Sequence, residues 1–177
     1  MKFSGTDLLG NVTIPEGVPT DVETSLEVSL DASSESYPLH TFNLLNDGVM
    51  EKIAKAFKLQ PSEIASATLE AGVVKAEGFT GPADGKVAVG LTNPDGKVSY
   101  AYSANGIGFW IAADGTASSW GDAPIYYEYD AVGYGLTVGH NPGHSEKGKT
   151  YTIKPTMVYN KGGKLHKAVI TIKMKFA

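Results

Sequence analysis

Apolar and polar residues alternate along most of this chain, a pattern typical of β-strands with one buried and one solvent-facing side. The alternation is regular from Thr24 to Leu30, predicts a second strand over 39–45, and continues in short segments from residue 68 to the end. Turn sequences rich in Asn, Asp, Gly and Pro separate these segments, at 93–96, 113–116, 141–143 and 160–163. About ten short strands with such spacing predict a mainly β fold, an antiparallel β-sandwich, with a barrel as the alternative.

Several strands are specific enough to predict which side chains point into the core. Leu69, Ala71 and Val73 are in phase with one another and predict a strand that begins near residue 68. A later strand should place the following residues on one side: Val132, Tyr134, Leu136 and Val138. The closing strand should point these residues inward: Ala168, Ile170, Ile172, Met174 and Phe176.

One segment has helical spacing instead. Its apolar positions recur every three or four residues: Val49, Met50, Ile53, Ala54 and Phe57. We expect a single helix near 47–58, capped by Asn46 or Asp47 and ended by Pro61, with a short second turn opened by Ser62 and Glu63. The sandwich should therefore carry one packed α-helix.

The segment MEKIAKAFKLQPSEIASA also resembles the central helices of repressor-type DNA-binding domains. A recognition helix presents polar or basic side chains to bases and phosphates, whereas SEIASAT carries no positive charge. None of the 15 basic residues in the chain is an arginine, the residue that most often makes forked contacts to phosphate and guanine. We therefore expect no nucleic-acid partner.

The length of 177 residues fits one domain, which we place at 21–177 after an irregular N-terminal arm or linker at 1–20. The chain has no cysteine, so it forms no disulfide and has no thiolate metal site. Its first residues lack the apolar core of a signal peptide, and no later run is long and apolar enough to span a membrane.

The stretch 98–140 holds both tryptophans and most of the tyrosines, interleaved with glycines. Because successive side chains of a strand point to opposite faces, Trp110 should lie on the face opposite to that of Ile107 and Ile111, where its neighbours are small. On a following strand, three glycines share one face: Gly133, Gly135 and Gly139. Such a face usually accommodates something flat, most often an aromatic ring of the same chain and otherwise a ligand.

Carbohydrate binding is the function that these residues favour. Sugar rings stack their C–H faces on aromatic rings, while carboxylates, amides and hydroxyls bind the sugar hydroxyls. The candidate ligand-binding residues are Trp110, Trp120, Tyr126, Tyr127, Asn105, Asp114 and Asp122. Any of these rings could instead belong to the core. We expect a non-catalytic extracellular module that binds carbohydrate; the alternative is a structural or assembly module that contacts a neighbouring protein domain.

Other chemistry is less well supported, and we assign no catalytic residue, metal or cofactor. His140 and His144 have the spacing of a zinc-binding pair on a helix, but Pro142 and Gly143 prevent a helix there. What remains is a weak candidate metal site, in which the two histidines on a turn are joined by Glu146. A weak glycoside hydrolase would need opposed carboxyl groups. The candidate carboxylates are Glu128 and Asp130, but these stand side by side on one strand and do not oppose each other. Asp122 would have to supply the partner from another strand.

Four motifs occur in order between Tyr100 and Tyr159: YxYxANGxGFW, DGxxxSWG, VGHNPG and YTIKPTMVY. Together with the helix and its KLQPSEI continuation, they resemble an uncharacterised domain family of secreted and surface-anchored Bacteroidetes lipoproteins, over residues 47–177. The resemblance implies export and a setting of glycan capture and breakdown, but it transfers no functional residue. The lipid-anchoring cysteine of such proteins is not present in this sequence.

Overall fold

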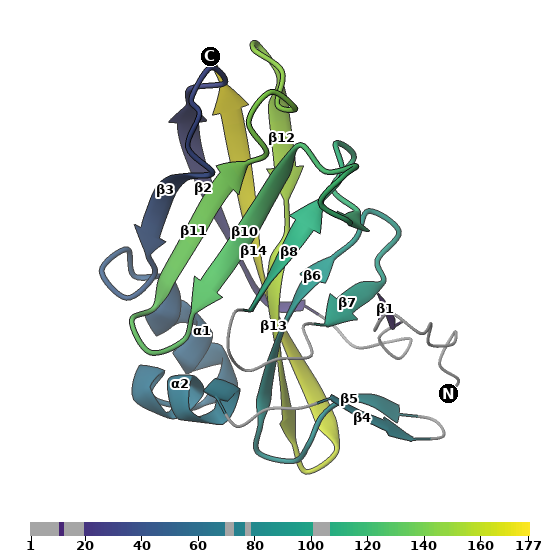
Figure 1. The fold of residues 1–177 in the computed structure, drawn as a ribbon. Helices are drawn as coiled ribbons and strands as arrows, with labels where there is room; N and C mark the ends of the chain where they lie inside the picture. The colour runs from purple at the N-terminus through teal and green to yellow at the C-terminus, as the bar shows by residue number, and fades with distance from the viewer. Residues whose placement is uncertain (1–10, 13–19, 70–72, 77–78, 101–106) are drawn as a thin grey trace.

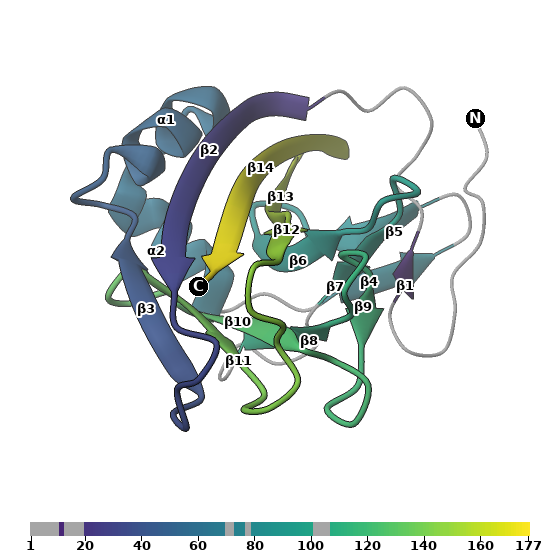
Figure 2. The same ribbon diagram turned by 90° about the horizontal axis from the view of Figure 1, so that it is seen from above.

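The structure is a computed structural model that describes residues 11–12, 20–69, 73–76, 79–100 and 107–177 (Figure 1). Two large β-sheets face each other (Figure 2). Apolar side chains from both sheets form a common core. The expected mainly β sandwich is confirmed, and the alternative of a barrel is wrong, because the strands form two separate sheets and not one closed sheet. Asn105 lies outside the described residues.

The seven-stranded sheet has the order β1-β7-β6-β13-β14-β12, with β2 paired to β14 in parallel. Its strands are β1 Asn11–Val12, β2 Thr20–Leu30, β6 Val87–Thr92, β7 Val98–Tyr100, β12 Thr150–Ile153, β13 Pro155–Lys161 and β14 Lys164–Phe176. The five-stranded sheet has the order β3-β11-β10-β8-β9. Its strands are β3 Pro38–Asn43, β8 Ile107–Ile111, β9 Ala117–Ser118, β10 Ile125–Asp130 and β11 Gly135–His140. A separate pair is formed by β4 Val73–Ala76 and β5 Phe79–Pro82.

Strand β14 pairs with three strands of the seven-stranded sheet, with β2 on one side and both β12 and β13 on the other. All five of the residues predicted to point inward are buried: Ala168, Ile170, Ile172, Met174 and Phe176. Burial of each of the four large apolar side chains contributes about 2 kcal/mol to folding. The alternating pattern of this strand therefore accounts for its position between solvent and core.

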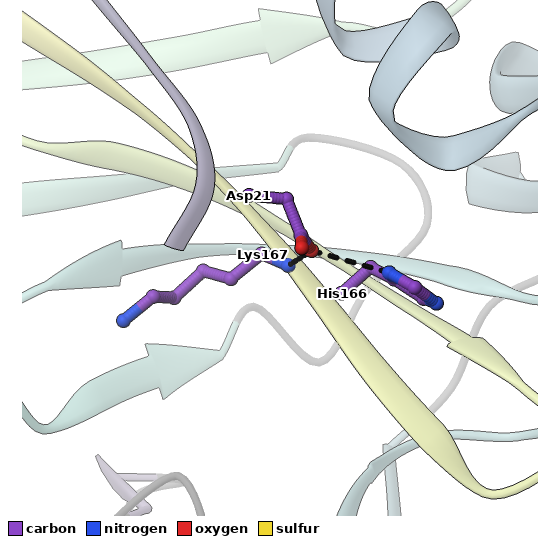
Figure 3. A network of polar contacts seen from close by, with 3 residues as sticks. All are labelled: Asp21, His166 and Lys167. Carbon is purple, nitrogen blue, oxygen red and sulfur yellow. Dashed lines mark hydrogen bonds and ion pairs between the residues drawn. The ribbon is translucent and has the colours of Figure 1, made fainter. Parts of the chain in front are cut away.

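Asp21 fixes the start of β2 against β14 (Figure 3). The pairing shifts register here, because Thr20 is opposite Lys167 while Val22 is opposite Ala168. The carboxylate of Asp21 accepts a hydrogen bond from the backbone N–H of Lys167 at 3.0 Å, and its Oδ2 lies 3.2 Å from Nδ1 of His166. A side chain thus provides a backbone N–H with an acceptor at the irregular point of the ladder.

The described part of the chain has two helices and not one, and they lie together at one end of the sandwich: α1 Val49–Phe57 and α2 Pro61–Leu69 (Figure 1). The five predicted apolar positions of α1 are all buried. The expected cap by Asn46 or Asp47 is wrong, because Gly48 occupies the N-cap with a left-handed backbone at φ 78° and no side-chain hydrogen bond. Among the described residues, no helix is long and apolar enough to cross a membrane.

The second helix was expected only as a short turn. Its start is stabilised by Glu63, whose carboxylate accepts a hydrogen bond from the backbone N–H of Gln60 at 2.9 Å. The helix continues through Leu69, so the strand predicted to begin near residue 68 is wrong at that position, and β4 begins at Val73.

The strand that carries the glycines is also shorter than predicted. β11 begins at Gly135, because Tyr134 adopts a left-handed backbone at φ 59° in the preceding turn. Leu136 and Val138 are buried as expected, whereas Val132 is 66% exposed in the turn. Gly133 is therefore not part of the glycine face, which consists of Gly135 and Gly139.

Candidate functional site

The outer face of the five-stranded sheet is the candidate site. Strand β10 lies at its centre, with β11 on one side and β8 on the other. Tyr127 and Tyr129 on β10 point inward and are buried, so the opposite parity places Tyr126, Glu128 and Asp130 on the outer face. This face therefore combines an aromatic ring with two carboxylates along a single strand.

Three aromatic side chains gather at one end of this face, and we name Tyr37, Trp110 and Tyr126 the aromatic patch. Trp110 is directly opposite Tyr126 in the β8–β10 pairing, and their ring centroids are 5.0 Å apart at an angle of 51°. Tyr37 meets Trp110 edge-on, with centroids 6.3 Å apart. Tyr126 is buried, Trp110 is half-buried and Tyr37 is exposed, so Trp110 and Tyr37 are the part of the patch that faces solvent.

Two adjoining depressions extend along β10, and we name them together the outer-face groove. The smaller has a volume of about 170 Å³ and is lined by Trp110, Tyr126 and Glu128, among others. The larger has a volume of about 390 Å³ and is lined by Thr41, Glu128, Asp130 and Thr137, with Leu69 and Val132. Glu128 lines both depressions, so its side chain lies next to each of them.

Small residues and hydroxyls form much of the remaining surface. Gly108 on β8 pairs with Glu128, and a Cβ there would lie only 2.6 Å from the carbonyl oxygen of Tyr127. Thr41 on β3 and Thr137 on β11 share a hydrogen bond of 2.7 Å between their hydroxyls. The groove thus offers hydroxyl groups beside its carboxylates, over a shallow floor.

The electrostatics of the groove are acidic. Among the described residues, no side chain forms a hydrogen bond or ion pair with the carboxylate of Glu128, and the residues that line the two depressions include no lysine or histidine. Asp130 accepts a hydrogen bond of 3.1 Å from the backbone N–H of Val132. Burial, together with the charge of Glu128, raises the pKa of Tyr126 to about 12, so its phenol stays neutral and able to donate.

Of the predicted binding residues that the structure describes, only Trp110 and Tyr126 have rings in contact with each other. Tyr127 is fully buried and its hydroxyl donates a hydrogen bond of 2.5 Å to the carbonyl oxygen of Gly90 on β6. The ring of Tyr127 therefore belongs to the core, the alternative that the sequence left open for each of these rings, although residue 127 also lines the smaller depression. Burial also raises its pKa.

The other predicted residues lie in turns. Trp120 is 57% exposed after β9 and lines neither depression of the groove. Asp114 accepts hydrogen bonds from Thr116, which lower the pKa of its carboxyl group and explain it as a turn residue. Asp122 is exposed and accepts a hydrogen bond of 3.4 Å from the hydroxyl of Ser119.

Sequence reasoning did not assign several residues of the aromatic patch and the groove to ligand binding: Tyr37 in the patch, and Thr41, Leu69, Glu128, Asp130, Val132 and Thr137 in the groove. A signal existed for two of these. Glu128 shares strand parity with Tyr126, and Thr137 lies between the glycines of β11. Tyr37 precedes β3 and reaches Trp110 only through the tertiary fold, so no local pattern identifies it.

The candidate metal residues are separated in the structure. His140 is fully buried, where its Nδ1 lies 2.7 Å from the hydroxyl oxygen of Ser145 and its ring stacks on Phe176 at 5.8 Å. His144 is exposed, and Glu146 pairs with Lys149 at 3.8 Å. Within the described part of the chain, no three His, Asp or Glu side chains are grouped to hold a metal ion.

The candidate hydrolytic carboxylates do not form an opposed pair around the groove. Glu128 and Asp130 project from the same face of β10, side by side, as the sequence predicts. Asp122, the expected partner, lies in the turn before β10 and lines neither depression. The arrangement is one that can accept hydrogen bonds from a ligand lying on the sheet.

Comparison with known proteins identifies a family but not an activity. No curated protein and no solved structure matches the chain. A domain of unknown function, DUF4859, matches residues 36–164, which include all the described residues of the aromatic patch and the groove but not β2 and most of β14. The motif resemblance was expected to cover residues 47–177, so the matched region begins earlier and ends earlier than expected. The chain belongs to this uncharacterised family, DUF4859.

Proposed function

We propose that this chain is a non-catalytic binding module that holds a glycan in the outer-face groove. One observation carries the proposal: a partly exposed aromatic patch adjoins Glu128, a carboxylate with no side-chain partner among the described residues, in a shallow depression of a rigid sheet. Sugars present an apolar ring face and a rim of hydroxyl donors, and this combination of groups complements both.

The roles of the residues follow from their positions. Trp110 supplies the stacking surface, and the edge of Tyr37 and the buried ring of Tyr126 hold its indole in place. Glu128, which lines both depressions, accepts hydrogen bonds from sugar hydroxyls. A backbone fixed within a sheet holds these groups in place, which lowers the entropic cost of binding.

We also propose an extracellular or cell-surface setting for this module, as the motif resemblance to secreted and surface lipoproteins implies. In that setting a glycan is an available ligand. A neighbouring protein domain that packs on the same face is the competing partner, since stacking rings and hydroxyls also suit protein contacts.

A glycan array tests the proposal, with Trp110→Ala as the disabling variant and Trp120→Ala as the matched control. We expect wild type and Trp120→Ala to bind the same glycans and Trp110→Ala to lose binding at least tenfold, an estimate of about 1.4 kcal/mol from loss of one stacking ring. Circular dichroism of each variant verifies the fold. Glu128→Gln, an exposed substitution, provides a second disabling variant if Trp110→Ala does not fold.

Two results would overturn the proposal. If wild type binds no glycan on the array, the assembly module is favoured. That function is then tested by measuring binding to the neighbouring domain of the parent protein. Release of sugar products by wild type, abolished in Glu128→Gln, would show that the groove hydrolyses the glycan and does not only hold it.

A further inference from the structure

We infer that the ligand of the outer-face groove is the interior of an extended glycan chain without acidic groups, lying along β10. This inference rests on the proposed glycan-binding function and goes beyond it in naming the class of glycan. The length of the groove and the sign of its charge carry the argument.

The groove is longer than one sugar ring. Its outward side chains on β10 are Tyr126, Glu128 and Asp130, and the first and last are separated by about 13 Å along a strand. The smaller depression adjoins Tyr126 and the larger adjoins Asp130, with Glu128 in both. A monosaccharide stacked on Trp110 would leave the Asp130 end empty, so consecutive sugar units fill the groove better.

The two ends of the groove differ in character but both offer apolar contacts. At one end is the aromatic patch. At the other, Leu69 and Val132 line the larger depression and are 39% and 66% exposed. Both ends can contact the C–H faces of sugar units, while Glu128 and the threonine pair between them accept and donate hydrogen bonds.

The charge of the groove selects against acidic glycans. Glu128 and Asp130 line it without any lysine or histidine among the described lining residues. A uronate or sulfate group on the ligand would approach two carboxylates with no compensating cation, and like charges repel even across partly screened distances. Neutral sugars avoid this repulsion, and an amino group on the sugar converts it into attraction.

Affinity electrophoresis in gels that contain one polysaccharide each tests the charge selection. The probes are xylan, mannan and mixed-linkage β-glucan as neutral chains, chitosan as the amino chain, and polygalacturonate and alginate as acidic chains. We expect retardation by at least one neutral or amino chain and none by either acidic chain. Retardation by an acidic chain equal to that by the others would overturn the inference while leaving glycan binding intact.

Charge variants test whether the carboxylates of the groove cause this selectivity. The double variant Glu128→Gln with Asp130→Asn should bring the affinity for acidic chains within about tenfold of that for neutral ones, because the repulsion is removed. The matched control is Asp114→Asn with Asp122→Asn, which removes the same charge from turns outside the groove and should change nothing. Equal effects of the two double variants would assign the selectivity to net charge and overturn a role for the groove.

Calorimetry with oligomers of the retarding chain, from two to six units, tests the length. Affinity should rise at least tenfold from the dimer to the tetramer and then level off, as the groove is filled. Equal affinity for the dimer and the hexamer would overturn the extended mode and leave the proposed function standing. Failure of every polysaccharide and oligomer to bind would instead overturn the proposed function itself.

Discussion

The ring of Tyr126 on β10 lies across the backbone of Gly139 on β11. The two residues are opposite each other in the pairing, and a Cβ built on Gly139 would lie 2.6 Å from the ring of Tyr126. It would also clash with the carbonyl oxygen of Tyr37. The glycine therefore allows the aromatic patch to lie close against the sheet, and an aromatic ring of the same chain covers it.

Substitution of Gly139 should disturb the patch. We expect Gly139→Ala to lower the free energy of unfolding by about 1–3 kcal/mol, because neither the Tyr37 backbone nor the Tyr126 ring has room to move away without loss of packing. The matched control is Gly135→Ala on the same strand and face, whose Cβ would lie 3.4 Å from a methyl group of Thr41 and should be tolerated. Urea unfolding of both variants measures the difference, and equal stabilities would contradict the close contact.

The two tryptophans should respond differently to quenchers. Trp120 is 57% exposed, whereas Trp110 is half-buried between Tyr37 and Tyr126. In single-tryptophan variants, acrylamide should quench Trp110→Phe, which retains Trp120, more strongly than Trp120→Phe. A bound glycan should protect Trp110 alone. Equal quenching of the two variants would contradict the difference in exposure of the two indoles, and protection of Trp120 would place the ligand outside the groove.

The sequence predicts the periodic parts of this fold and misses those that depend on tertiary contacts. Parity placed Tyr126 and Tyr127 on opposite faces of β10, but it could not decide which face is buried, and both were assigned to the ligand. The buried face is the one that carries Tyr127, whose hydroxyl donates a hydrogen bond to the carbonyl oxygen of Gly90 on the opposite sheet. In the same way Trp120 was assigned as an aromatic residue near a strand, although the strand ends at Ser118 and leaves it in a turn.

The helical region shows a similar limit. Apolar spacing identified the buried face of α1 because that face repeats every three or four residues. The cap was missed because the backbone enters the helix through a left-handed Gly48, and the side chain of Asn43 instead accepts hydrogen bonds from Leu45 and Asn46. Local propensity favoured Asn46 or Asp47, and the preceding turn overrode it.

Tyr127 ties the two sheets together, since it lies on β10 and its hydroxyl donates to Gly90 on β6. Tyr127→Phe should lower the free energy of unfolding by about 1–2 kcal/mol, because the buried carbonyl loses this donor. Tyr126→Phe provides the control: its hydroxyl forms no hydrogen bond with the described residues, so stability should change by less than about 0.5 kcal/mol. Thermal unfolding compares the two, and a larger loss in Tyr126→Phe would contradict these roles.

Thr24 on β2 buries a hydroxyl that has no hydrogen-bond partner among the described residues. Thr24→Val replaces this group with a methyl of similar size and should raise the free energy of unfolding by about 1 kcal/mol. Thr171 on the neighbouring strand β14 is the matched control, because its hydroxyl donates to Glu23 at 3.1 Å. Thr171→Val should leave stability unchanged or lower it by up to about 1 kcal/mol. Destabilisation by Thr24→Val would indicate that the hydroxyl has a partner.

Buried phenols make the fold sensitive to alkali. Burial raises the pKa of Tyr100, Tyr127 and Tyr129, and burial with the charge of Glu128 raises the pKa of Tyr126 to about 12. In the unfolded chain these phenols ionise near pH 10, an approximate value for free tyrosine. The unfolded state therefore loses protons first as the pH rises, and each raised pKa contributes stability that is complete below about pH 10 and declines above it.

Stability should accordingly fall as the pH increases from about 10 to 12, and Tyr126→Phe should reduce this loss, because one of the phenols that ionise later in the folded state is removed. Urea unfolding at a series of pH values measures the free energy, while tyrosinate absorbance follows ionisation. Ionisation of Tyr100, Tyr127 and Tyr129 at about pH 10 in a chain that remains folded would contradict the burial of these rings. The packed core of the sandwich requires that these three buried phenols ionise only as the chain unfolds.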